Sequence, residues 1–250
     1  MNMSEYGVRE RTGVEQGQLV MPFYLICDVS ASMTGDIAAL NDGVERLRQA
    51  IVAEPLVDDV AQICVMTFSD TAKVVMPMNQ MSHQNRVPTL SIEGGTNYGA
   101  AFRCLADAIA RDSASLKGQG YKVYRPCAFF LTDGEPNDRD WHRTYSQTLT
   151  YDHQAGVGMK AHPIFVPFGF RAAKESVLAQ LAYPKDRGKW YHSRNTSVED
   201  ALKGILEIIM NTVVTAGRTA GSGQPVVTQT APALGSGIVQ GDSSYDPDYV

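Results

Sequence analysis

Three clusters of oxygen-bearing side chains stand beside short apolar runs of this chain. Asp28, Ser30 and Ser32 follow the first run, Thr96 stands in the segment EGGTNYG, and Asp133 follows the run CAFFLT. Carboxylate and hydroxyl oxygens are hard ligands, which suit Mg²⁺ or Mn²⁺ better than Zn²⁺. The residue types therefore indicate a site for a divalent cation, provided that the fold brings the three clusters together.

The spacing of the first cluster favours this chemistry. Asp28, Ser30 and Ser32 are two residues apart in chain that leaves a strand, so their side chains can converge on one side. If the two hydroxyls bind the cation, Asp28 and Asp133 can accept hydrogen bonds from them or from bound water. The cation then lacks a strongly anionic ligand. It is ready to exchange one of its waters for a carboxylate of another molecule.

The elements around these clusters alternate between apolar runs and amphipathic stretches. Buried strands are predicted at 19–27, 60–68, 126–132 and 162–168, an antiparallel edge strand at 72–78 and a short strand at 189–192. Helices are predicted at 37–51, 98–115, 174–181 and 198–213, with a weaker helical pattern at 140–159. This alternation predicts an α/β domain with a mainly parallel sheet that helices cover on both faces. Such sheets bind ligands beyond the carboxyl ends of their strands, where the three clusters fall.

The composition divides the chain into three parts. Residues 1–17 are polar and predict an N-terminal arm, and residues 18–214 predict one domain. Residues 215–250 are rich in Gly, Ser, Thr and Pro and predict a disordered tail. The tail carries Asp242, Asp246 and Asp248 near its end, so it is either a plain solubilising segment, the favoured interpretation, or an internal competitor for the cation site.

Charge and cysteine usage narrow the possible partners and the compartment. The chain has 22 basic and 27 acidic residues, a balance that argues against nucleic acid or anionic lipid as a partner. The start MNMSEYGVRERTG lacks the apolar core of a secretory signal, and no apolar run is long enough to span a bilayer. The four cysteines form no CxxC pair and are expected to be reduced thiols. We therefore expect a cytoplasmic protein.

Four segments carry a resemblance to a known family: YLICDVSASMTG, TFSDTAKV, GGTNYG and FFLTDGEPND. Over about 18–214 the chain resembles a von Willebrand factor type A domain with a metal ion-dependent adhesion site. The resemblance implies a Rossmann-like sheet with one antiparallel edge strand, and a non-catalytic module that binds an Asp or Glu of a protein partner. It further implies that Ser30 and Ser32 bind Mg²⁺ directly, that Thr96 binds it directly or through water, and that Asp28 and Asp133 act mostly through water.

The same segments are similar to those of bacterial cytosolic proteins of the tellurium-resistance type. Proteins of that type are associated with stress-response modules that can include protein kinases and phosphatases. The resemblance therefore implies a cytoplasmic protein of a stress response, and a kinase or phosphatase module among its possible partners.

One enzymatic alternative remains open. A Mg²⁺-dependent phosphatase or phosphotransferase of the haloacid dehalogenase type uses an Asp nucleophile after a strand, and Asp28 has that place. That family has a second Asp two positions later as acid and base, whereas this chain has Ser30. The leaving group would then lack a proton donor, which disfavours this alternative.

Several further polar residues fall near the expected cation. Asp36, Glu93, Glu135 and Asp138 are either helix-end and turn formers, the favoured interpretation, or an acidic rim that selects a basic partner. Trp141 and His142 follow directly and are candidates for an aromatic edge of the binding face.

Overall fold

The computed structural model describes residues 17–195, 197–221 and 226–245. The main sheet contains β1 (Leu19–Asp28), β2 (Ala61–Phe68), β3 (Ala72–Asn79), β4 (Lys122–Val123), β5 (Cys127–Thr132), β8 (Ile164–Gly169), β9 (Lys189–Ser193) and β10 (Ile238–Asp242). A separate hairpin pairs β6 (Tyr151–Asp152) with β7 (Val157–Gly158). The helices are α1 (Ile37–Val52), α2 (Pro55–Asp58), α3 (Tyr98–Gly118), α4 (Trp141–Thr148), α5 (Glu175–Leu181) and α6 (Val198–Gly221), with short 3-10 turns η1 (Ala31–Gly35) and η2 (Met81–His83).

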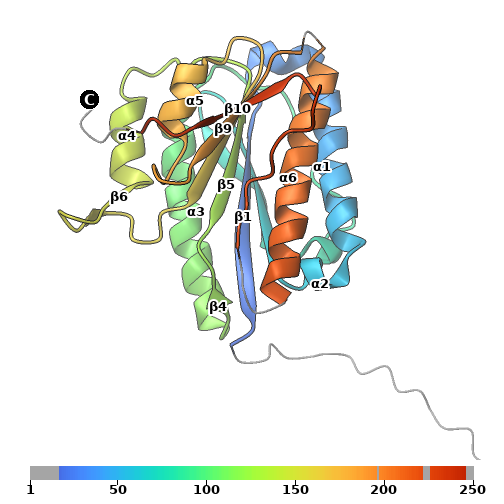
Figure 1. Ribbon diagram of the computed structural model, residues 1–250, viewed down its shortest axis with the longest axis vertical. Coiled ribbons are helices and arrows are strands. Elements are labelled where there is room, and N and C mark those ends of the chain that lie inside the picture. The colour runs from blue at the N-terminus through green and yellow to red at the C-terminus, as the bar shows by residue number, and fades with distance from the viewer. Residues whose placement is uncertain (1–16, 196, 222–225, 246–250) are drawn as a thin grey trace, which may run out of the picture.

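The sheet is mainly parallel, as the sequence predicts. Its strands follow the order β10-β9-β8-β5-β1-β2-β3, and β4 pairs with the start of β1. The central strand β1 is parallel to β2 and β5, and β5 is parallel to β8. The edge strand β3 runs antiparallel to β2, as expected, and β10 adds a second antiparallel edge beside β9. Because β1, β5 and β8 are parallel, their carboxyl ends meet at one edge of the sheet, at the top of Figure 1.

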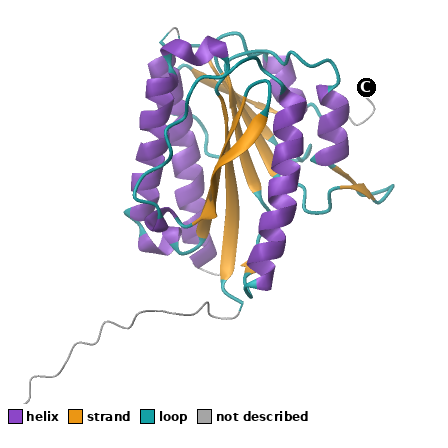
Figure 2. Cartoon of the chain, turned by 180° about the vertical axis from the view of Figure 1, so that it is seen from behind, coloured by secondary structure: helices purple, strands orange, loops and turns teal. Residues whose placement is uncertain are grey.

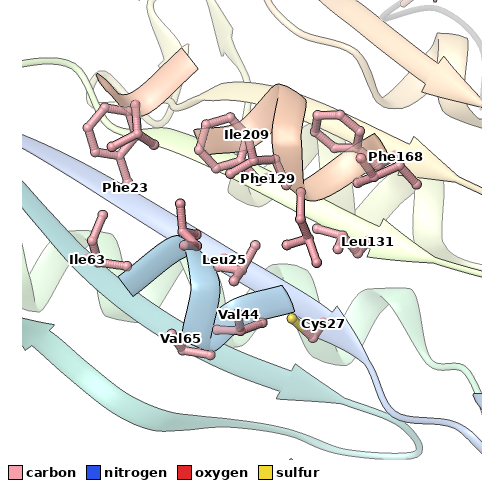
Figure 3. Packing of buried hydrophobic residues seen from close by; sticks show 14 of the residues in the cluster. Phe23, Leu25, Cys27, Val44, Ile63, Val65, Phe129, Leu131, Phe168 and Ile209 are labelled. Atoms are coloured by element: carbon pink, nitrogen blue, oxygen red, sulfur yellow. The ribbon is translucent and has the colours of Figure 1, made fainter. Parts of the chain in front are cut away.

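Helices cover both faces of this sheet, and β1 shows how its residues divide between them. Phe23, Leu25 and Cys27 belong to the core beneath α1 and α6, where Val44 and Ile209 also pack (Figure 3). The alternate residues of β1, Tyr24 and Ile26, belong to the core beneath α3 and α4. Successive side chains of a strand point to opposite faces, and a strand that is covered on both faces has a continuous apolar sequence. Figure 2 shows the same three layers from behind.

The structure corrects the helical pattern expected at 140–159. The helix α4 ends at Thr148, and the chain then forms the β6–β7 hairpin. Gly156 and Gly158 have φ angles of 69° and 104°, which side-chain-bearing residues rarely adopt. A Cβ at Gly158 would also lie 2.3 Å from the carbonyl oxygen of Thr150. These two glycines favour a hairpin over the continuation of the helix.

Two parts of the expected tail have regular structure, which its composition did not predict. The helix α6 extends to Gly221, past the expected boundary at 214, and residues 238–242 form β10 against β9. Backbone pairing to an open sheet edge needs few apolar side chains, so composition did not reveal it. Asp242 pairs with Lys189 at that edge. Asp246, Asp248 and nearly all of the expected N-terminal arm lie outside the described residues.

The cysteines and the apolar character of the helices were both subjects of sequence predictions. All four cysteines are free thiols; Cys27, Cys64 and Cys127 are buried and Cys104 is partly buried, in line with the sequence prediction. No helix in the described ranges has the length and apolar character needed to cross a bilayer.

Candidate functional site

The carboxyl edge of the sheet brings two of the three polar clusters into direct contact. The strand β1 ends at Asp28, and Asp133 follows the last residue of β5. Ser32 Oγ donates a hydrogen bond to Asp133 Oδ1 over 2.8 Å, and the hydroxyl oxygens of Ser30 and Ser32 lie 3.0 Å apart. Asp133 is 2% exposed, whereas Ser32 is exposed to solvent. The parallel pairing of β1 with β5 therefore joins residues that are about a hundred positions apart in the chain.

Asp28 lies behind the serines and is 1% exposed. Its Oδ1 accepts a hydrogen bond from the backbone N–H of Ser30 over 2.9 Å, and its Oδ2 accepts one from Thr132 Oγ1 over 2.8 Å. Burial raises the pKa of Asp28 to about 6, against the lowering effect of the bonds from Ser30 and Thr132, and the nearby charge of Asp133 adds to the rise. Asp28 therefore orients the loop after β1 and the end of β5.

Tyr98 supports this arrangement from the first turn of α3. Its buried hydroxyl donates to the carbonyl oxygen of Gly134 over 2.9 Å and lies 3.1 Å from Thr132 Oγ1. Burial raises the pKa of the phenol well above its usual value, so the group stays protonated. Thr132 and Tyr98 are positioning residues that the metal-ligand pattern alone did not single out.

The third cluster lies in the loop before α3. Backbone hydrogen bonds connect this loop to the loops that carry the other two clusters. Ala31 N–H donates to the carbonyl oxygen of Gly94 over 2.9 Å, and Asn137 N–H donates to that of Thr96 over 2.8 Å. Thr96 is 8% exposed. Within the described residues its hydroxyl forms no hydrogen bond with Ser30, Ser32 or Asp133. The structure thus places Thr96 between the two other loops, and within the described residues its side chain forms no hydrogen bond with the serines.

The loop before α3 contains two consecutive glycines, Gly94 and Gly95, because a side chain at either position would clash with Asp70. A Cβ at Gly94 would lie 1.7 Å from Asp70 Oδ2, and a Cβ at Gly95 would lie 2.6 Å from Asp70 Oδ1. The carboxylate of Asp70, which follows the end of β2, therefore packs directly on the glycines. It adds an acidic group to this edge of the sheet that the sequence analysis missed.

Arg171 is a second missed residue, and it contacts the candidate site directly. It follows β8, and its φ of 53° is the one left-handed conformation of a non-glycine residue in the described chain. Its Nη1 donates to the carbonyl oxygen of Ser32 over 2.8 Å and to Asp133 Oδ2 over 3.2 Å. The same guanidinium pairs with Asp36. A lone arginine after an apolar strand carries no sequence signal for this role.

The four rim acids have structural partners. Asp138 accepts hydrogen bonds from the backbone N–H groups of Tyr98 and Gly99, each over 2.9 Å, which supports the interpretation as a helix-end residue. Asp36 pairs with Arg171, as described above. Glu93 pairs with Lys73 and Glu135 with Lys174. These ion pairs neutralise much of the acidic rim that the sequence left open.

The expected aromatic edge is largely part of the core. Trp141 is 7% exposed and lies edge-to-face with Tyr98, their ring centres 6.1 Å apart. The ring of His142 stacks on Trp141 with centres 3.4 Å apart. Beside these residues is a polar hollow of about 420 Å³, lined by Glu135, Asn137, Arg139, Lys174 and Gln180 among others. The surface next to the site is therefore polar and of mixed charge.

The donor set fits a hard divalent cation better than zinc. No three His, Cys, Asp or Glu side chains converge as metal ligands anywhere in the described parts of the chain. The cluster instead combines two hydroxyls with two carboxylates. Ligands on adjacent octahedral positions about 2.1 Å from Mg²⁺ lie about 3.0 Å apart. The hydroxyl oxygens of Ser30 and Ser32 share a hydrogen bond of 3.0 Å, and this spacing is compatible with adjacent ligands of such a cation.

The fold and the position of the site define a class. The molecule is an open α/β domain whose polar loops meet at the carboxyl edge of a parallel sheet, where such folds bind ligands. Residues 23–135 match the family model of the von Willebrand factor type A domain, which supports the sequence resemblance over that segment. Domains of this family are protein-interaction and adhesion modules. A search of curated protein sequences found no significant match.

Solved structures of several other proteins share the fold at low sequence identity. Proximal thread matrix protein 1 from the mussel byssus, "with zinc occupied MIDAS motif", has a TM-score of 0.53 and 16% identity over 80% of this chain and 49% of that one. The von Willebrand factor type A protein from Catenulispora acidiphila has a TM-score of 0.53 and 16% identity over 78% and 43%. The open conformation of the pilus adhesin SpaC from Lactobacillus rhamnosus GG has a TM-score of 0.55 and 12% identity over 81% and 31%. This chain thus spans less than half of each of these proteins.

Proposed function

We propose that this protein is a non-catalytic, metal-dependent interaction module. One Mg²⁺, or Mn²⁺ in its place, is held by Ser30, Ser32 and Thr96, with Asp28 and Asp133 acting mostly through water. The cation binds an Asp or Glu carboxylate of a protein partner. The observation that carries the proposal is the contact of Ser30, Ser32 and Asp133 at the carboxyl edge of the sheet.

The charge of this donor set explains why a partner carboxylate would bind. Two of the candidate ligands, Ser30 and Ser32, are neutral hydroxyls, and Asp133 already accepts hydrogen bonds from Ser32 and Arg171. A cation held in this way keeps much of its positive charge, and it gains a strong anionic ligand when the partner arrives. Cation and partner should therefore increase each other's affinity by the same factor.

Arg171 gives the site a second positive charge. Its guanidinium is about one-third exposed and bonds both Ser32 and Asp133. A fixed positive charge next to the cation weakens cation binding, yet it attracts an incoming carboxylate. We therefore assign Arg171 a role in coupling the two ligands.

The burial of Asp28 argues against the phosphotransferase alternative. Both carboxylate oxygens of Asp28 accept hydrogen bonds from within the fold, and the side chain is nearly inaccessible to solvent. A nucleophile needs an exposed oxygen within reach of the substrate. Asp28 lacks one, and Ser30 stands where the acid would be, so the binding role is better supported.

The sequence resemblance extends the proposal to a cellular setting. We place the protein in the bacterial cytoplasm, in a stress-response system of the tellurium-resistance type, where a kinase or phosphatase module is a candidate partner. The acidic net charge and the mixed-charge surface beside the site favour a protein partner over nucleic acid.

A capture experiment tests this function. The full chain is immobilised, and bound bacterial proteins are compared in Mg²⁺, in excess EDTA and after Mg²⁺ is restored. The proposal expects a partner that is captured only with Mg²⁺ and is lost from the Ser30→Ala, Ser32→Ala double variant. Ser82→Ala, on an exposed serine of η2, is the matched control and should capture normally. Capture that is equal in EDTA and Mg²⁺ would contradict the proposal.

A further inference from the structure

A large cavity lies at the opposite end of β5 and β8 from the candidate metal site. Its volume is about 1080 Å³, and its wall includes the β6–β7 hairpin and the segment 183–187. Arg125 lies two residues before β5 and His162 lies two residues before β8, and both line it. Each strand has six residues, so the cavity is about 20 Å from the loops that follow these strands.

Three cations line this cavity without a carboxylate partner. Arg125, Lys185 and Arg187 all contribute to the wall, and within the described chain no carboxylate lies within ion-pair distance of any of them. Arg125 uses one nitrogen, Nη1, to donate to the carbonyl oxygen of His162 over 2.8 Å. Burial, together with the positive charge of Arg187, lowers the pKa of Arg125. Both guanidinium groups therefore belong to the wall of one cavity, and the Arg187 side chain is exposed to solvent.

The two acidic residues of the wall do not offset this charge. The carboxylate of Asp152 accepts hydrogen bonds from the backbone N–H groups of Gln154 and Ala155, over 2.7 and 2.9 Å, and so stabilises the hairpin turn. Asp186 is exposed and lies beside Arg187 in the chain, but it forms no ion pair with any residue of the described ranges. An anion that enters the cavity would meet guanidinium groups that no internal carboxylate has satisfied.

Aromatic rings form another part of the wall. His162 and Tyr183 lie edge-to-face with ring centres 4.9 Å apart, and Tyr183 lies edge-to-face with Tyr245 at 5.1 Å. His162 is 3% exposed, and its Nδ1 has no hydrogen-bond partner in the described structure. Burial and the charges of Arg125, His153 and Arg187 lower the pKa of His162 to about 4, so the ring is neutral at pH 7. The cavity thus joins a cationic region to a neutral aromatic one.

We propose that this cavity binds a small organic phosphate of nucleotide size. Arg125 and Arg187, with Lys185, bind the phosphate, and the tyrosines and His162 contact the ring system. Guanidinium groups form paired hydrogen bonds with phosphate oxygens, and small-molecule cavities commonly have volumes of about 300–1,000 Å³. The role is independent of the metal site, because none of the candidate metal ligands lines the cavity.

Calorimetry on the full chain tests this proposal with three probes: AMP, adenosine and inorganic phosphate. We expect AMP to bind more tightly than either of its parts. Arg187→Gln should weaken AMP binding about tenfold, because one charge-assisted contact to phosphate is lost. The Arg187 side chain forms no hydrogen bond or ion pair within the described part of the chain, so the variant should fold normally. Asp186→Asn should act in the opposite direction and tighten AMP binding.

Arg46→Gln is the matched control. Arg46 is an exposed arginine of α1 that does not line this cavity, so the variant makes the same charge change elsewhere. Absence of AMP binding, or equal weakening by Arg187→Gln and Arg46→Gln, would overturn the proposal. Adenosine that binds as tightly as AMP would exclude a role for the phosphate. Inorganic phosphate that binds as tightly as AMP would exclude a role for the rings.

Discussion

The two ends of strands β5 and β8 differ in the charge of the side chains beside them. At the carboxyl end, Asp28 and Asp133 meet hydroxyls and Arg171, and every carboxylate oxygen of the pair accepts a hydrogen bond. At the amino end, Arg125 and Arg187 line one cavity, and neither has a carboxylate partner among the residues that the structure describes. One end is therefore suited to a cation and the other to an anion. A parallel sheet can hold two sites of different chemistry, because the loops at its two edges vary independently.

A shared aromatic core separates the two ends. Phe130, in the middle of β5, stacks on Phe68 with ring centres 4.8 Å apart and lies edge-to-face with Tyr98 at 4.9 Å. It also lies 5.6 Å from the ring of Phe165 in β8. Tyr98 reaches from this core to the metal-site end, as described above. The core therefore supports the residues at both ends.

The largest expected effect comes from disturbing this core. Phe130→Ala should lower the free energy of unfolding by about 3–5 kcal/mol, because it removes a fully buried ring and leaves a cavity. Urea unfolding followed by circular dichroism measures the change, with Val157→Ala on the exposed hairpin as the control. A loss below about 1 kcal/mol would show that the core does not support the two ends in this way.

A second prediction removes charge from the metal-site end alone. Asp133→Asn keeps the shape of the side chain but loses the charge, so Mn²⁺ affinity should fall at least about tenfold. Titration of Mn²⁺ followed by electron paramagnetic resonance measures the affinity. Asp42→Asn, on an exposed acid of α1, should leave it unchanged. If both variants behave alike, Asp133 has no special role in cation binding.

A third prediction concerns the positive charge at that same end. Arg171→Gln should increase Mn²⁺ affinity about fivefold, because the guanidinium competes with the cation for Asp133 and a partly exposed ion pair contributes about 1 kcal/mol. Arg194→Gln removes an exposed arginine that pairs with Glu175 and is the control. Weaker Mn²⁺ binding by the Arg171 variant would instead show that this residue assembles the site.

The smallest expected effect is a pH dependence at the amino end. The pKa of His162 is lowered to about 4 in the folded state, below its ordinary value of 6.5, because burial and the nearby positive charge of Arg125 disfavour the charged ring. The unfolded chain takes up a proton first, so folding stability is lost as the pH falls from about 6.5 towards 4. Urea unfolding at pH 7 and 5.5 should show a smaller loss for His162→Gln than for the parent chain. Equal losses would place the titrating group elsewhere.

The sequence predicted the arrangement of polar residues at the carboxyl end far better than that at the amino end. Buried strands appear as apolar runs, and the polar residues that follow them, such as Asp28 and Asp133, are placed by strand direction alone. Arg171 was missed because its contact with Asp133 depends on the left-handed backbone conformation after β8. It also joins two residues that are far apart in the chain. The cavity was missed for a similar reason: Arg125 and Arg187 approach each other only through the packing of separate loops.

The errors in secondary structure have physical causes of the same kind. The strand β10 carries little apolar signal, because its pairing with β9 rests on backbone hydrogen bonds at a sheet edge. Gly241 also accommodates the ring of Trp190, from which a Cβ would lie only 2.2 Å. Such complementarity between residues far apart in the chain has no local pattern.

The central claim is that the hydroxyls of Ser30 and Ser32 hold a divalent cation beside Asp133. The most direct measurement is the number of Mn²⁺ ions that bind per chain, determined by electron paramagnetic resonance titration of the full protein and of the Ser30→Ala, Ser32→Ala variant. We expect one site in the parent chain and loss of that site in the variant, with an unchanged circular dichroism spectrum. Unaltered Mn²⁺ binding by the variant, or no binding by the parent chain, would contradict the claim.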